Sequence, residues 1–228
     1  MLVNIAEFAI KEHTYVDKNC LALLLALALT PVSQRLMAWC LERNRASLVE
    51  YNLEPGPVCS KITLALGLAV ALFLGLAVPA SVVGKALSCF LLCWLWLLWL
   101  IDYRFQFIFD DSLVPLLTVA VVATPWLPFS IWQRLAAGAG AFVVLAALAI
   151  LGRGALGGGD VKMMAVLGLW LGVNGIITTA CIGFILGGVA AIIMLLCKVH
   201  GRKDFFAFGP FLIIGAVVAW LGQVLLWK

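Results

Sequence analysis

Charged residues are scarce in this chain of 228 residues. They make up 11% of it, whereas hydrophobic residues make up 65% and the mean hydropathy is +1.15. Soluble domains hold about 25% charged residues, so an ordinary globular protein is excluded. Apolar runs of about 20 residues recur, as membrane-spanning helices require, and the alternating pattern of a membrane β-barrel is missing. The sequence therefore predicts an all-α, polytopic membrane helical bundle.

Residues for several common kinds of site are also missing. The seven cysteines include no CxxC pair, and no HExxH zinc helix is present. The two histidines, His13 and His200, leave few candidates for a Ser–His or Cys–His catalytic pair. The basic residues stand singly between apolar runs, which is not the pattern of a nucleic-acid-binding patch. We expect no metal, no cofactor and no nucleic-acid partner.

The apolar runs divide the chain into a tail, a first span with its loop, and a membrane core. Residues 1–19 are too polar for a signal-peptide core and form a polar tail or an interfacial helix. Residues 20–61 hold the first span and a short cytoplasmic loop, and residues 62–228 form the core. The third and sixth spans look short. The eight expected spans lie at about residues 20–37, 62–83, 86–101, 113–129, 135–151, 160–173, 175–197 and 206–227.

The distribution of lysine and arginine indicates the orientation, because cytoplasmic loops carry an excess of these residues. If the segment between the first two spans is cytoplasmic, ten basic residues lie inside and five outside, the latter including Arg134. Both termini are then outside. The same orientation places Asp102 and Asp160 at one depth on the cytoplasmic side, where they could form a pair.

Asp160 follows three glycines and opens an apolar run, and Asp102 ends the third span. A carboxylate at a membrane boundary is costly and therefore usually functional, and glycines allow a sharp turn and a close approach. Asp102 alone reads equally well as a cap or a snorkelling charge. Together, the ionised carboxylate would take a proton from water and the protonated one would donate to a scissile carbonyl. The pair predicts a metal-free aspartic protease.

Neighbouring residues have both functional and structural readings. Lys162 either interacts with Asp160, binds a substrate carboxylate, or is an ordinary basic flank. Asp110, Asp111 and Ser112 suit the N-terminal cap and first turn of the next helix. We expect supporting or substrate-binding roles for Gly157, Gly159, Lys162 and Asp110.

These elements resemble the bacterial type IV prepilin peptidases, which are membrane aspartic proteases of the GxGD class. Residues 157–162 match the GxGDxK run of that family, residues 101–116 resemble its "ID…PD…LPL" segment, and residues 207–211 resemble its "PFGP" element. The resemblance covers roughly residues 86–226. It implies that Asp102 and Asp160 are the catalytic pair of a multi-pass enzyme of the bacterial inner membrane. The substrate would be a prepilin or pseudopilin of a type IV pilus or type II secretion system, cut at the cytoplasmic face before its hydrophobic helix.

The chain departs from this family pattern in two places. Phe109 stands where the family usually has proline, which predicts an altered loop shape. Many relatives also carry two CxxC pairs between the first two spans and N-methylate the product, whereas here the polar segment 43–61 holds only Cys59. A short form with peptidase activity alone is expected.

Two other functions remain open on the sequence. A small proton- or cation-coupled transporter could use the same carboxylates near mid-membrane. A catalytically silent pilus-assembly protein could retain the fold. For a peptidase we expect a groove, open to lipid or cytoplasm, near the third, fourth and sixth spans.

Overall fold

The computed structural model describes residues 2–45, 59–127, 129–152, 156–197 and 208–226, and the side chains of all of these except residues 2–20 and 226. The described residues form helices and no strands, which confirms the predicted all-α fold. The elements are α1 (Leu2–Arg43), α3 (Lys61–Ala77), α4 (Val82–Phe105), α5 (Asp110–Val122), the 3-10 helix η1 (Thr124–Trp126), α6 (Ile131–Leu151), α7 (Gly158–Leu196) and α8 (Gly209–Leu226).

The helices form a polytopic membrane bundle. Four of the described helices are long and apolar enough to cross a membrane: α1 from Leu21 onward, α4, α6 and α7. The helices α3 and α8 are also apolar but shorter. The element α7 supplies two of the predicted segments, because its backbone is non-helical at Gly172 and a kink there separates two helical halves.

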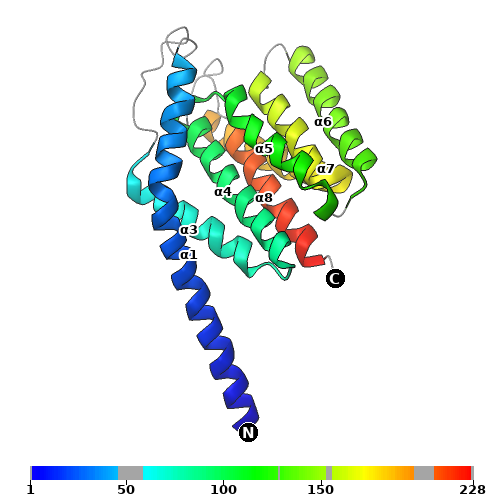
Figure 1. Cartoon of the computed structure of the whole chain (residues 1–228). Helices are drawn as coiled ribbons and strands as arrows, with labels where there is room; N and C mark the ends of the chain where they lie inside the picture. The colour runs from blue at the N-terminus through cyan, green and yellow to red at the C-terminus, as the bar shows by residue number, and fades with distance from the viewer. Residues whose placement is uncertain (1, 46–58, 128, 153–155, 198–207, 227–228) are drawn as a thin grey trace.

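Several predicted boundaries are wrong. The second span ends at Ala77 and not at residue 83, and the helix of the fourth span ends at Val122 and not at residue 129. The third span is not short, because α4 begins at Val82 and continues past Asp102 to Phe105 over 24 residues. The first span does not end at residue 37, because α1 continues to Arg43. Hydropathy marks where a helix leaves the hydrocarbon, whereas backbone hydrogen bonding extends the helix through polar residues. The predicted polar tail is also helical. Its residues 2–19 form the first part of α1, which projects beyond the other helices (Figure 1).

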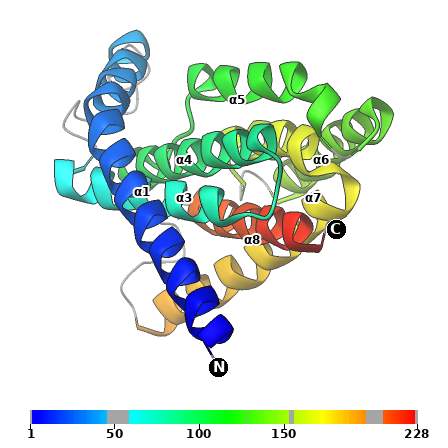
Figure 2. The ribbon, with the colours of Figure 1, turned by 60° about the horizontal axis from the view of Figure 1, so that its bottom comes forward.

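Most helices pack against a neighbour in sequence. The principal contacts pair α1 with α3, α3 with α4, α6 with α7, and α7 with α8. The last helix, α8, also contacts α4, so it links the two halves of the bundle (Figures 1 and 2). Three helix ends therefore meet in one region: the C-terminus of α4 and the N-termini of α7 and α8.

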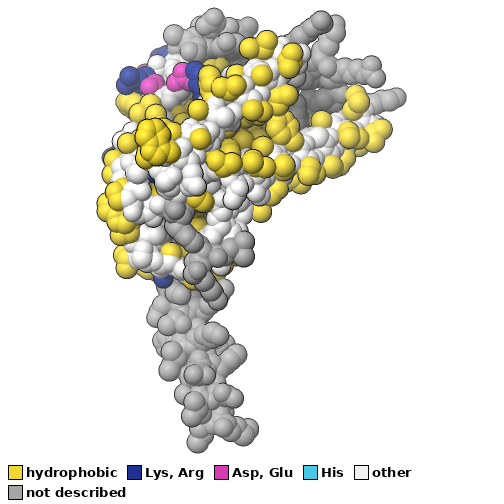
Figure 3. All heavy atoms as spheres, turned by 90° about the vertical axis from the view of Figure 1, so that its right-hand side faces the viewer, with side chains coloured by type: hydrophobic (Ala, Val, Ile, Leu, Met, Phe, Trp, Pro, Cys, Tyr) yellow, Lys and Arg dark blue, Asp and Glu magenta, His cyan; other side chains and the backbone are white. Residues whose placement is uncertain are grey.

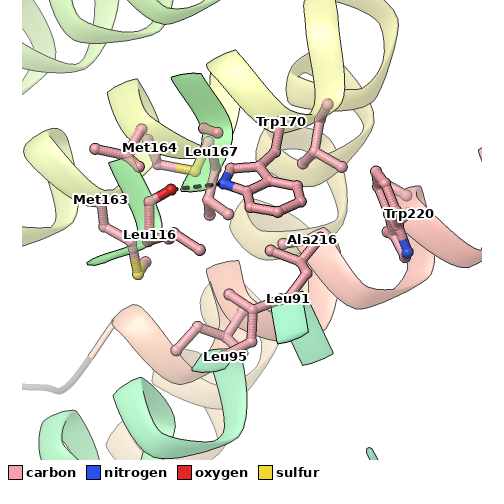
Figure 4. Packing of buried hydrophobic residues seen from close by; sticks show 14 of the residues in the cluster. Leu91, Leu95, Leu116, Met163, Met164, Leu167, Trp170, Ala216 and Trp220 are labelled. Atoms are coloured by element: carbon pink, nitrogen blue, oxygen red, sulfur yellow. Dashed lines mark hydrogen bonds between the residues drawn. The ribbon is translucent and has the colours of Figure 1, made fainter. Parts of the chain in front are cut away.

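Buried tryptophans connect these helices. Trp170 of α7 has no exposed surface, and its indole N–H donates to the carbonyl oxygen of Leu116 on α5 at 3.0 Å (Figure 4). Trp220 of α8 packs edge-on against Trp170 and donates to Ser88 Oγ of α4 at 3.1 Å. Because the bilayer core holds no water, each indole N–H needs an acceptor within the protein. These bonds hold α4, α5, α7 and α8 around one core.

The bend in α7 is covered by side chains from two other helices. Gly172 has φ +63°, which interrupts the helical hydrogen bonds around it. Arg134 of α6 donates from Nε to the carbonyl oxygen of Leu169, and Gln223 of α8 donates to that of Leu171 at 2.9 Å. The bend is therefore part of the folded structure, with its freed carbonyl oxygens paired.

Arg134 also connects the end of α5 to this bend. The sequence predicts it as a flanking charge on the outside, but its side chain is only 1% exposed. It donates to Thr124 Oγ1 at 2.8 Å and to the carbonyl oxygen of Ala120, in addition to Leu169. A guanidinium group can serve several acceptors in fixed geometry, which explains why burial of this charge is tolerated.

Candidate active site

Asp102 lies in the last turn of α4 and faces the protein interior. Its side chain is 4% exposed, and Oδ2 has no hydrogen-bond partner among the described residues. Gln106 adopts a left-handed conformation that ends the helix, and its N–H donates to the Asp102 carbonyl oxygen at 2.7 Å. The helix therefore ends about one helical turn after Asp102, and Asp102 itself lies in regular α-helix.

Asp160 lies in the first turn of α7 and is 7% exposed. Gly157 occupies the N-cap position, so Asp160 is the third helical residue, and its carboxylate is hydrogen-bonded to the backbone of Gly157. A side chain at this position that reaches back to the N-cap N–H is half of a capping box. The glycine turn therefore fixes the direction of the Asp160 side chain.

Gly209, the first residue of α8, brings the two carboxylates together. A Cβ atom added to Gly209 would lie 2.5 Å from Asp102 Oδ2 and 3.1 Å from Asp160 Oδ1. The two oxygens are therefore no farther apart than the sum of these distances. The backbone N–H of Gly209 also interacts with the Asp102 carboxyl group, at a helix N-terminus that favours negative charge. Gly209 belongs to the family-like element at residues 207–211, but its sequence pattern does not mark it as a site residue.

The three glycines before Asp160 have different surroundings. A Cβ atom on Gly159 would lie 2.9 Å from Ile108 Cβ and 3.1 Å from the Ile108 carbonyl oxygen, so this glycine permits close contact with the α4–α5 connection. A Cβ atom on Gly158 would have no atom within 4 Å, and one on Gly157 would meet only Asp160. The close approach expected for the glycine run therefore occurs at Gly159.

Lys162 and Asp110 form an ion pair beside the carboxylates. Lys162 Nζ lies 2.7 and 2.8 Å from the two carboxylate oxygens of Asp110, which joins the first turn of α5 to the first turn of α7. Lys162 thus binds Asp110 in this structure. Asp110 is not the cap of α5, because Phe109 takes that position without a side-chain hydrogen bond. Asp110 and Asp111 instead occupy the first turn, where the helix dipole favours them.

Other charged side chains lie at the same end of the bundle. Asp111 is 3.0 Å from Arg43 Nε and accepts a hydrogen bond from Asn44 Nδ2 at 3.2 Å, so α1 is also joined to α5. In the view of Figure 3, Lys, Arg, Asp and Glu side chains gather near one end, above a largely apolar surface. The buried aspartates thus lie at the polar end of the molecule, below a surface of paired charges. The basic residues expected in the loop after residue 197 lie outside the described residues.

Phe109 retains a backbone conformation that proline could adopt. Its φ of −73° and ψ of 138° lie within the range that proline permits. The ring is buried and packs edge-on against Phe105 and Phe107, which holds the connection into Asp110 against the core. The change from the family residue therefore requires no different backbone at this position.

The site thus contains two buried carboxyl groups that lie close together beside the N-terminus of α8. Among the described residues, no group of three or more His, Cys, Asp or Glu side chains could hold a metal ion. No described Lys or Arg forms an ion pair with either Asp102 or Asp160. Two carboxyl groups without a cation are suited to acid–base chemistry in which one accepts a proton and the other donates one.

Comparisons with known proteins show what parts of the chain are similar to. Residues 89–192 match the type IV leader peptidase family. The chain is 35% identical over 77 residues to the prepilin leader peptidase/N-methyltransferase of Neisseria gonorrhoeae. The aligned residues cover 34% of this chain and 26% of that protein. It is 28% identical over 121 residues to the protein of the same description from Bacillus subtilis, which covers 53% of this chain and 49% of that protein.

A third relative, from Xanthomonas campestris, carries the same description and is 36% identical over 70 residues, or 31% of this chain and 23% of that protein. The chain thus spans half or less of the length of the curated relatives it matches. No solved structure matches the chain significantly. The matched region contains Asp102 and Asp160, so both aspartates lie in the part of the chain that is similar to the type IV leader peptidase family.

Proposed function

We propose that this protein is an aspartic endopeptidase that removes the leader peptide from type IV prepilins or pseudopilins. The observation that carries the proposal is the meeting of two buried carboxyl groups, Asp102 and Asp160, at Gly209. The family match supports peptidase chemistry, and the names of the relatives support the substrate class.

In the proposed reaction, the scissile peptide bond lies beside the two carboxyl groups together with one water molecule. The ionised carboxylate takes a proton from water, which attacks the carbonyl carbon. The protonated carboxyl group donates its proton to the carbonyl oxygen, which gives a tetrahedral diol. The diol then returns a hydroxyl proton to the carboxylate that is now ionised, the C–N bond breaks, and the other carboxyl group donates the proton taken from water to the leaving amine. The backbone amide at the α8 N-terminus adds a favourable dipole at the same point. Which aspartate begins protonated is a property of the pair.

We also propose that the protein lies in the bacterial inner membrane with the carboxylates toward the cytoplasm. Arg43, Arg104 and Lys162 stand at the same end of the bundle as the aspartates, as the positive-inside rule predicts for the cytoplasmic end. A transporter would place its carboxylates near mid-membrane, whereas here they lie at helix ends. The peptidase is therefore the better-supported function.

Cleavage by the purified protein tests this proposal. The protein is reconstituted with a prepilin, and the loss of the leader is followed by the change in substrate size. We expect Asp102→Asn and Asp160→Asn each to abolish cleavage while retaining side-chain shape, and Asp111→Asn, a carboxylate paired with Arg43 away from the site, to cleave normally. Full activity of either site variant would refute the assignment. A wild-type protein that cuts no prepilin would favour a transporter or a silent assembly protein.

We further propose that the protein does not N-methylate its product. The segment between α1 and α3, residues 44–60, contains Cys59 alone and no CxxC pair. Mass spectrometry of the new N-terminus, with S-adenosylmethionine present, provides the test. A methyl group whose addition depends on this protein would overturn the peptidase-only form.

A further inference from the structure

An apolar groove lies between α3, α4 and α8. Its volume is about 440 Å³, within the range of about 300–1,000 Å³ typical of ligand sites. Residues of all three helices line it, among them Val70 of α3, Trp96 and Trp99 of α4, and Ile213 and Val217 of α8. We call this cavity the α3–α4–α8 groove. From the sequence we expect a groove near the third, fourth and sixth spans. Of these, only the third span, α4, contributes to this groove.

The groove begins about one helical turn from the aspartates. Trp99 precedes Asp102 by three residues on α4, and Ile213 follows Gly209 by four residues on α8. Residues three or four apart lie on the same face of a helix, about 5 Å along its axis. Two of the three helices that meet at the carboxylates therefore continue as walls of the groove.

The chemistry of the groove restricts what can occupy it. Its lining is almost entirely apolar. The exception is Thr63, which lies near the N-terminus of α3. From Leu92 to Trp99 the α4 wall rises about 10 Å, which is close to two turns of an α-helix. Within a membrane, a peptide can occupy such a site only if its backbone groups are paired internally, as in a helix.

A rigid aromatic wall favours a protein occupant over lipid. Trp96 and Trp99 pack edge-to-face with ring centroids 5.1 Å apart, and the Trp96 indole lies directly over Gly67, where any Cβ atom would overlap it. Large aromatic side chains held in fixed positions are the usual anchors of protein interfaces. Gly67 and the two tryptophans therefore give the groove a defined shape.

A second groove on the bundle provides a contrast. It lies between α6 and the two halves of α7, has a volume of about 280 Å³, and includes Val144 in its lining. Neither α4 nor α8 contributes to it, and its link to the aspartates is Met164, which is 1% exposed. The second groove thus adjoins one of the three helices that meet at the carboxylates, whereas the α3–α4–α8 groove adjoins two of them.

We propose that the α3–α4–α8 groove binds the apolar helical segment of the substrate that adjoins the scissile bond. This inference rests on the proposed peptidase function and specifies its substrate: a peptide with an extended stretch at the aspartates and a membrane-embedded apolar helix on one side. The groove selects the substrate by its apolar helix, and the aspartates cut the chain where the helix ends.

Two matched substitutions separate the grooves. Val70 is 59% exposed in the α3–α4–α8 groove and Val144 is 57% exposed in the second groove, so Val70→Trp and Val144→Trp make the same change in similar settings. We expect Val70→Trp to lower kcat/KM for a full-length prepilin by about tenfold or more, as loss of a buried interface anchor does, and Val144→Trp to leave it unchanged. Melting curves show whether each variant is folded.

Photo-crosslinking identifies the occupant without relying on turnover. A photoreactive phenylalanine is placed at position 70 or 144 in an Asp160→Asn background and illuminated with prepilin in vesicles. We expect position 70, and not position 144, to become attached to the apolar helix of the prepilin. Attachment to lipid alone, equal attachment at both positions, or wild-type cleavage by a folded Val70→Trp variant would overturn the inference. Wild-type protein that cuts no prepilin would instead refute the proposed function itself.

Discussion

Replacement of Gly209 by alanine tests how the two carboxylates are held. Gly209 has an ordinary helical backbone, so alanine changes only the space beside it. The added Cβ atom would lie 2.5 Å from Asp102 Oδ2, 2.9 Å from Asp102 Cγ and 3.1 Å from Asp160 Oδ1. Such contacts normally need at least 3.4 Å. Either α8 or the Asp102 carboxyl group must therefore move by about 1 Å, since close-packed interiors have little free space.

A movement of this size is large for a catalytic group. Displacement of reacting groups by about 1 Å can cost on the order of 100-fold in rate, which corresponds to about 2.7 kcal/mol in the activation barrier. We expect Gly209→Ala to lower kcat for prepilin cleavage by about this factor, because the added methyl group changes the position of the Asp102 carboxyl group relative to that of Asp160. KM should change less, since Gly209 does not itself line the α3–α4–α8 groove.

Gly222 provides the matched control within the same helix. A Cβ atom at Gly222 would have no atom within 4 Å, so Gly222→Ala adds the same methyl group to α8 without a clash. The assay compares single-turnover cleavage by the two variants after their melting temperatures have been measured. If folded Gly209→Ala cleaves at the wild-type rate, the carboxylates do not depend on this contact and the proposed geometry is wrong.

Three further predictions concern the surroundings of the site. Gly159→Ala should lower both melting temperature and activity because its Cβ atom would overlap Ile108, whereas Gly158→Ala should be neutral or stabilising by up to about 1 kcal/mol, as thermal unfolding will show. Lys162→Asp should lower activity, and the double exchange with Asp110→Lys should restore it. Both side chains are largely exposed, so the free energy of unfolding should change by less than about 1 kcal/mol. A double variant no more active than Lys162→Asp would refute the pairing. Arg134→Met should destabilise the protein by about 3 kcal/mol or more, because buried acceptors lose their donors, and an unchanged melting temperature would contradict this account.

The sequence by itself determines the membrane helices and the two aspartates. Scarce charge and long apolar runs allow little besides a helical membrane bundle, because unpaired backbone groups are not tolerated in lipid. A carboxylate after three glycines at the start of an apolar helix stands out for the same energetic reason. Hydropathy located the helices but not their ends: α4 continues past Asp102 because hydrogen bonding, and not apolarity, extends a helix.

Tertiary structure alone decides which residues meet the aspartates. Gly209 lies 49 positions after Asp160 along the chain, and its role depends on α8 packing between α4 and α7. The same holds for Arg134, which reads as a flanking charge but is buried against carbonyl oxygens freed by the end of α5 and the bend in α7. Local sequence indicates whether one helix favours lipid or water as its surroundings. Close contacts between residues depend instead on how the surfaces of several helices pack together. The two aspartates were therefore visible in the sequence, but the glycine between them was not.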